Sequence, residues 1–192
     1  MTSIRSTVGD WRAIEIASSR PVRMAIGAVV FATATALSAK IQVVIPNTPV
    51  PFTFQPLLVL LSGARLGGRL GASSQLLYLM AGALGVPVFA FGGGAAYLLG
   101  PTGGYLLAYP LAAMAVGALM GPGYLRTVVA MLAGLAIIYA GGVAWLAAIF
   151  GTDSVLALGL VPFILADLVK VALGVVVAKR LRSGSLSLFG VR

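Results

Sequence analysis

The sequence contains no cysteine and no histidine, and only four of its 192 residues are acidic. The absence of thiols and imidazoles excludes disulfide bonds, thiol nucleophiles, zinc fingers and imidazole acid–base catalysis. Charged residues make up 9% of the chain, whereas an average soluble domain has about 25%. These deficits favour a membrane protein over a soluble domain, and they leave few groups with which an enzyme could work. We therefore expect neither enzymatic activity nor a cofactor.

Long apolar runs dominate the rest of the sequence. Hydrophobic residues make up 60% of the chain, and apolar runs of about 17–25 residues are typical of transmembrane helices. We predict an all-α integral membrane protein with six transmembrane helices, at about residues 23–45, 54–64, 70–91, 103–119, 125–150 and 156–178. The second segment is short for a membrane core of about 30 Å, so we expect it to be the most tilted or the least regular.

The basic residues that produce the net charge of +9 also predict an orientation. If the N-terminus is cytoplasmic, the loops on that side contain Arg65, Arg69 and Arg126, and the C-terminal tail is basic. Lysine and arginine are absent from the opposite loops, at residues 46–53, 92–102 and 151–155. By the positive-inside rule, both termini are predicted to be cytoplasmic. No basic stripe alternates with aromatic residues, so nucleic acid is not expected as a partner.

The predicted domains are a cytoplasmic leader, a six-helix membrane domain and a basic cytoplasmic tail, at residues 1–23, 24–180 and 181–192. Val8, Trp11 and Ile14 give the leader a weak apolar spacing. This spacing fits either a short helix at the membrane interface or a frayed polar terminus.

An acid and a base, Asp167 and Lys170, lie three residues apart in the last apolar segment. On a helix this spacing places both side chains on one face. A charge at the centre of the membrane costs about 2.5–3.5 kcal/mol on insertion scales, and such residues often mark a substrate path. The pair could be a mutual ion pair, or Asp167 could cap a helix start. In a third interpretation, Lys170 binds a ligand carboxylate and Asp167 accepts N–H groups from the ligand's polar end.

Lys40 lies near the outer end of the first predicted helix. With Asp167 and Lys170 it would give an intramembrane cavity a net charge of +1, which suits a small monoanion. Alternatively, its side chain reaches the outer headgroups.

A proline-rich loop, Pro46–Pro51, precedes Phe52-Thr53-Phe54-Gln55. Its three prolines fix φ and remove hydrogen-bond donors, so the loop is stiff. It either caps a pocket, with Asn47 or Gln55 directed inward, or it is a plain turn between two helices.

A second predicted outer segment, from Phe91 to Tyr105, is glycine-rich and mostly apolar. It matches neither the dinucleotide fingerprint nor the phosphate-binding P-loop, and the chain has no P-loop elsewhere. It either re-enters the membrane as a lid, with Tyr97 or Tyr105 available to a ligand, or it simply connects two helices.

Ala28, Ala32 and Ala36 recur every four residues along the first predicted helix. Small residues at this spacing let another helix approach closely. That helix belongs either to the same chain or to a different membrane subunit.

Several stretches together resemble the BioY family, the biotin-specific substrate-binding (S) components of energy-coupling factor (ECF) transporters. In the family's order, they are Thr48-Pro-Val-Pro-Phe-Thr-Phe-Gln55, Ser74-Gln-Leu-Leu-Tyr-Leu79 with Gly85-Val-Pro-Val-Phe89, Gly100-Pro-Thr-Gly-Gly-Tyr105 and Pro162-Phe-Ile-Leu-Ala-Asp-Leu-Val-Lys170. They cover about residues 24–180. One departure is Leu165-Ala166, where the family pattern often has Pro-Gly before the aspartate. The Asp-x-x-Lys spacing is intact.

The resemblance implies a protein of a bacterial or archaeal cell membrane, surrounded by lipid and without enzymatic activity. Such a protein captures biotin, its transported ligand, from the outer side. It then associates with a transmembrane coupling subunit and two ATPases, which drive biotin inward. The sequence leaves open whether the chain also forms homo-oligomers.

The resemblance also implies roles for individual residues. The substrate-binding residues that it implies are Asp167 and Lys170 first, followed by Gln55, Tyr78 and Tyr97. It favours the coupling subunit as the partner of the alanines at 28, 32 and 36. The competing hypotheses are an S component for another small vitamin and a self-sufficient secondary transporter driven by protons through Asp167.

Overall fold

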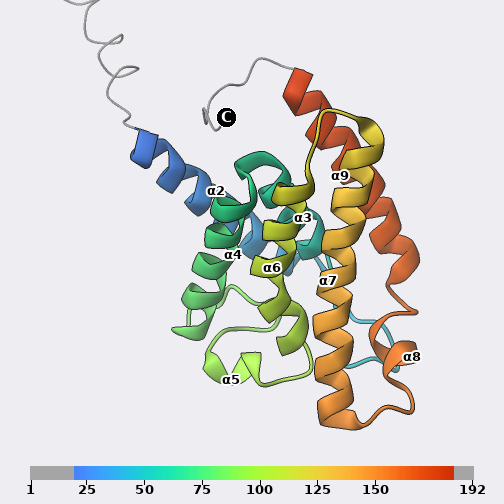
Figure 1. Ribbon diagram of the computed structural model, residues 1–192. Coiled ribbons are helices and arrows are strands. Elements are labelled where there is room, and N and C mark those ends of the chain that lie inside the picture. Colours follow the sequence, from blue (N-terminus) through green and yellow to red (C-terminus); the bar gives the residue numbers. More distant parts are fainter. Residues whose placement is uncertain (1–19, 184–192) are drawn as a thin grey trace, which may run out of the picture.

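A computed structural model describes residues 20–183, which form eight helices and one two-stranded hairpin (Figure 1). The helices are α2 (Arg20–Lys40), α3 (Gln55–Leu66), α4 (Gly68–Ala83), α5 (Ala95–Leu98), α6 (Gly103–Leu119), α7 (Tyr124–Phe150), α8 (Val155–Gly159) and α9 (Ile164–Ser183). The hairpin pairs β1 (Gln42–Val43) with β2 (Phe52–Thr53) in antiparallel fashion. The chain is therefore mostly helical, with a small β element that the prediction of an all-α protein did not include.

The fourth and fifth predicted segments agree closely with α6 and α7, whereas two earlier segments end sooner than predicted. Helix α2 stops at Lys40 instead of residue 45, because Gln42 and Val43 pair with Thr53 and Phe52. Helix α4 stops at Ala83 instead of residue 91. Gly85 takes a positive φ of 98° in the loop that follows, a conformation that ends a helix.

The last predicted segment, residues 156–178, was wrong as a single helix. It divides into the short α8 and the longer α9, with a turn around Pro162 between them. Asp167 lies in the first turn of α9, and its amide already donates a helical hydrogen bond of 2.9 Å to the carbonyl of Phe163. The interpretation of Asp167 as a helix N-cap is therefore wrong, because an N-cap residue lies outside the helix.

Helix α6 occupies the centre of the bundle, where it packs against α3, α4 and α7. Its contact with α3 is so close that a Cβ added at Gly63 would collide with the backbone carbonyl of Ala113. A Cβ added at Gly71 on α4 would lie 2.8 Å from the Cα of Gly63. Because these positions are glycine, the backbones of α3, α4 and α6 can come into direct contact.

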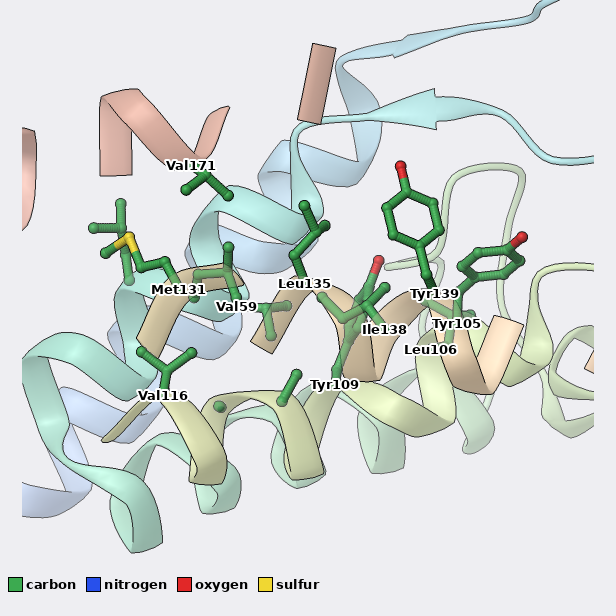
Figure 2. Packing of buried hydrophobic residues seen from close by; sticks show 14 of the residues in the cluster. Val59, Tyr105, Leu106, Tyr109, Val116, Met131, Leu135, Ile138, Tyr139 and Val171 are labelled. Carbon is green, nitrogen blue, oxygen red and sulfur yellow. The ribbon is translucent and has the colours of Figure 1, made fainter. Parts of the chain in front are cut away.

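The residue types in the hydrophobic core change from one end of the bundle to the other. Figure 2 shows aliphatic residues such as Val116 and Met131 toward one end, and Tyr105, Tyr109 and Tyr139 together toward the other. The tyrosine end lies on the side of the molecule that holds α5, α8 and the hairpin. The opposite end holds the start of α2, the α3–α4 junction, the start of α7 and the end of α9 (Figure 1).

A buried polar cluster joins the first three long helices. Gln75 on α4 donates to the hydroxyl oxygens of Ser62 (3.2 Å) and Ser74 (3.1 Å) and accepts from the hydroxyl of Thr35 on α2 (3.3 Å). All four side chains are fully buried. Side-chain hydrogen bonds of this kind stabilise helix–helix contacts inside membranes.

Within residues 20–183, two helices are long and apolar enough to cross a membrane by length and composition alone, Pro21–Lys40 and Tyr124–Phe150. The predicted interfacial helix of the leader lies outside the described residues, as does most of the predicted basic tail.

Candidate functional site

A cavity lies between the hairpin, the first turns of α3, α6 and α9, and the middle of α7. It holds about 570 Å³ of space not filled by protein atoms, counting its open mouth. Its wall is mostly apolar and aromatic, and its polar groups include those of Thr53, Gln55, Tyr139, Asp167 and Lys170. The shape and lining suit a small, largely apolar ligand with one polar end.

Asp167 and Lys170 lie side by side in this cavity. The Lys170 Nζ and the Asp167 Oδ1 are 2.6 Å apart, and the two residues are only 3% and 5% exposed. The ammonium also donates to the carbonyl of Thr53 (2.6 Å), and Asp167 Oδ2 accepts from the Tyr139 hydroxyl (2.5 Å). The pair is therefore an ion pair, and an ammonium group still has one further N–H to offer.

The geometry bears on two expectations. Asp167 and Lys170 are 2.6 Å apart and face the same part of the cavity, so one end of a ligand can meet both residues; their assignment to opposite ends stays a prediction. Lys40 does not line the cavity; its exposed side chain donates to the carbonyl of Phe89 (2.7 Å). The net charge of the residues that line the cavity is thus zero instead of the expected +1.

The hairpin holds two aromatic rings near Lys170. The ammonium lies 3.6 Å from the ring centroid of Phe52 and 5.5 Å from that of Phe54. A cation over an aromatic face is attracted by about 2 kcal/mol when both groups are desolvated. The segment after the proline-rich loop therefore contributes to the cavity, whereas Asn47 in the loop itself is exposed and does not line it.

Gln55 begins α3 and lines the cavity, and Tyr78 lies behind it. The Gln55 amide donates to the Tyr78 hydroxyl (2.5 Å), and its carbonyl oxygen accepts from the Thr53 hydroxyl (3.2 Å). Tyr78 does not line the cavity. The structure thus places it where it orients Gln55.

The glycine-rich segment also borders the cavity. Tyr97 on α5 lines it, and its ring stacks on Phe89 with centroids 4.9 Å apart. Tyr105 lines it from α6, and its hydroxyl donates to the carbonyl of Gly159 (2.6 Å), which ties α6 to α8.

Tyr109 and Tyr139 line the cavity but were not predicted from the sequence. Each lies in the middle of a long apolar segment, and a tyrosine there is commonly a core residue. The sequence feature that could have identified these two residues is a hydroxyl group in an apolar segment with few other polar groups.

Part of the alanine stripe on α2 packs against the rest of the chain. Ala32 is 7% exposed and belongs to the core, while Ala28 and Ala36 are half-buried. Helix α2 packs against α3 and α4, so these small residues allow close packing within the chain. The outward face of α2 presents Val22, Ile26 and Val29.

The BioY family model matches residues 11–185, nearly the whole chain. The chain belongs to the BioY family. A probable biotin transporter BioY from Pyrococcus horikoshii is 44% identical to this family member over 156 residues, which cover 81% of this chain and 93% of the relative. A biotin transporter BioY from Thermotoga maritima is 41% identical over 142 residues, or 72% of this chain and 84% of the relative.

A solved structure supports the same family assignment for this BioY chain. It is described as the S-component for biotin from an ECF-type ABC transporter, and it aligns with a TM-score of 0.78 at 25% identity. The alignment covers 86% of this chain and 94% of the solved one. The relatives come from bacteria and archaea and are named for transport, not catalysis. The chain is thus a membrane protein of a transport family.

Proposed function

We propose that the chain is the high-affinity biotin-binding S component of an ECF-type importer. The observation that carries the proposal is the buried Asp167–Lys170 pair at one side of an apolar, aromatic cavity. Relatives that cover most of the chain are named biotin transporters, and the similar solved structure is a biotin S-component. Biotin combines an apolar bicyclic body with a ureido group and a carboxylate, which fits the mixture of surfaces in the cavity.

The ureido group, and not the carboxylate, is the end of biotin that faces the pair. A ureido group presents a carbonyl acceptor beside N–H donors. Lys170 offers an N–H donor and Asp167 offers carboxylate oxygens at adjacent positions. A pair of zero net charge has little attraction for a carboxylate, which would also lie close to Asp167. This orientation replaces the sequence-based assignment of Lys170 to the carboxylate.

Six of the helices, α2, α3, α4, α6, α7 and α9, would cross the membrane, with both termini cytoplasmic. Support comes from the basic side chains of Arg65, Arg69, Arg126, Lys179 and Arg180, which lie on helix ends at the side opposite the cavity (Figure 1). The positive-inside rule makes that side cytoplasmic and leaves the cavity on the outer side. Helix α3 has 12 residues and would span about 18 Å, so it relies on the hairpin to complete its crossing.

Energy for inward transport would come from partner subunits. The sequence has no P-loop with which the chain could hydrolyse ATP itself. We therefore assign to the chain the capture of biotin, and to a transmembrane coupling subunit with two ATPases the release of biotin inside. We assign a surface on α2 to the contact with the coupling subunit. It consists of the partly exposed alanine stripe and the apolar outer face of the same helix.

Altered ligands test the site and its orientation. Isothermal titration of the purified full chain should show saturable binding of biotin, and biotin methyl ester should bind within about tenfold of it. Methylation of a ureido nitrogen should weaken binding by about 100-fold or more, because it removes a donor to Asp167 and leaves a buried acceptor unpaired. A larger loss for the ester than for the ureido derivative would reverse the orientation. No binding of biotin would overturn the proposed function.

A further inference from the structure

Tyr109 on α6 has a free hydroxyl in the wall of the cavity. The residue is 3% exposed and lines the cavity, yet its hydroxyl has no hydrogen-bond partner within residues 20–183. Three neighbouring phenol groups are engaged: Tyr78 with Gln55, Tyr105 with the Gly159 carbonyl and Tyr139 with Asp167. Tyr97, on the short helix α5, is only half-buried. The hydroxyl is not one of the fully enclosed side-chain atoms that lack a partner, so it opens onto the cavity, where a ligand can reach it.

The ring that carries this hydroxyl is held firmly. Tyr109 stacks on Tyr78, with ring centroids 6.4 Å apart and an angle of 27° between the rings. It also belongs to the same buried cluster as Leu106 and Ile138, which line the cavity beside it. Figure 2 shows Tyr109 at the same end of the core as Tyr105 and Tyr139. The hydroxyl therefore occupies a fixed position before any ligand binds, which lowers the entropic cost of the contact.

We infer that the Tyr109 hydroxyl donates a hydrogen bond to the carbonyl oxygen of the ligand's ureido group. This inference rests on the proposed biotin site and identifies a residue that sets its specificity. The ureido oxygen has two lone pairs, of which the remaining N–H of Lys170 satisfies one. Asp167 accepts from a ureido N–H and cannot donate as a carboxylate. Tyr109 supplies the second donor, so the site recognises a carbonyl flanked by N–H groups and rejects rings that lack it.

The competing explanation is that Tyr109 only fills the core. Tyr109→Phe separates the two, because it keeps the stacked ring and removes only the hydroxyl. We expect Tyr109→Phe to raise the Kd for biotin by about tenfold or more, with an unchanged melting temperature of the ligand-free protein. Tyr124→Phe is the matched control, since Tyr124 is exposed at the start of α7 on the opposite side of the molecule, and it should bind biotin like the wild type.

A ligand-side change gives the second measurement. In 2′-thiobiotin a sulfur replaces the ureido oxygen and accepts hydrogen bonds more weakly. We expect this change to weaken binding to the wild type by a larger factor than to Tyr109→Phe, because the variant has already lost the contact. Wild-type affinity for biotin in Tyr109→Phe, or an equal penalty for the thio ligand in both proteins, would overturn the inference. If the wild type itself fails to bind biotin, the proposed function fails first.

Discussion

Lys170→Met should raise the Kd for biotin by at least about 100-fold. Methionine has a similar length and fills the same space, but it removes the ammonium that donates to the Thr53 carbonyl, to Asp167 and, in our account, to the ligand. Loss of one partner of a buried charged hydrogen bond typically costs about 2–5 kcal/mol of binding free energy. Isothermal titration of the purified full chain in detergent measures the change.

The same variant should be less stable, by about 3–5 kcal/mol, because Asp167 would be left as a buried carboxylate without its counter-charge. The double variant Asp167→Asn/Lys170→Met removes both charges and should recover much of the melting temperature. It should not recover biotin binding. This combination separates loss of the site from loss of the fold. Wild-type affinity in a folded Lys170→Met protein would contradict the assignment of Lys170 to the site.

Gly63→Ala should destabilise the bundle by about 3 kcal/mol. The added methyl group would collide with the carbonyl of Ala113, a backbone atom that cannot rotate away, so α3 and α6 would have to separate. Overpacking of this kind typically costs about 1–3 kcal/mol, and a rigid neighbour places the cost at the upper end. Thermal unfolding in detergent should show a clearly lower midpoint.

Gly123→Ala is the control for this substitution. A Cβ at Gly123 would meet no atom within 4 Å, and its φ of −75° is accessible to alanine. Gly123 is the N-cap of α7, where glycine is preferred over alanine, so we expect the unfolding midpoint of this variant to fall, but by much less than that of Gly63→Ala. Equal midpoints for Gly63→Ala and Gly123→Ala would show that α3 and α6 are not in backbone contact.

The charged residues of the site could be predicted from the sequence. Asp167 and Lys170 stand out because ionisable residues are rare in apolar segments, and helical spacing places them on one face. Their close contact with each other could not be predicted, because the distance between two flexible side chains depends on rotamers and on neighbours such as Thr53 and Tyr139. The sequence contains no local signal for those contacts.

The helical segments were predictable where apolar runs are uninterrupted, as in α6 and α7. The hairpin was missed because its strands have only two residues each, too few for an alternating pattern to be visible. Tyr109 and Tyr139 were missed for a different reason. A phenol in an apolar helix looks like a core residue, and only the fold shows that these two face a cavity.

Mass spectrometry of the ligand bound to the purified full chain tests directly whether this protein captures biotin. The protein would be incubated, before purification, with an equimolar mixture of small vitamins that includes biotin, and the bound fraction would be released by denaturation and quantified. We expect biotin to be the retained vitamin at close to one equivalent per chain, and to be lost in Asp167→Asn/Lys170→Met. Retention of a different vitamin, or of biotin undiminished in the double variant, would contradict the account.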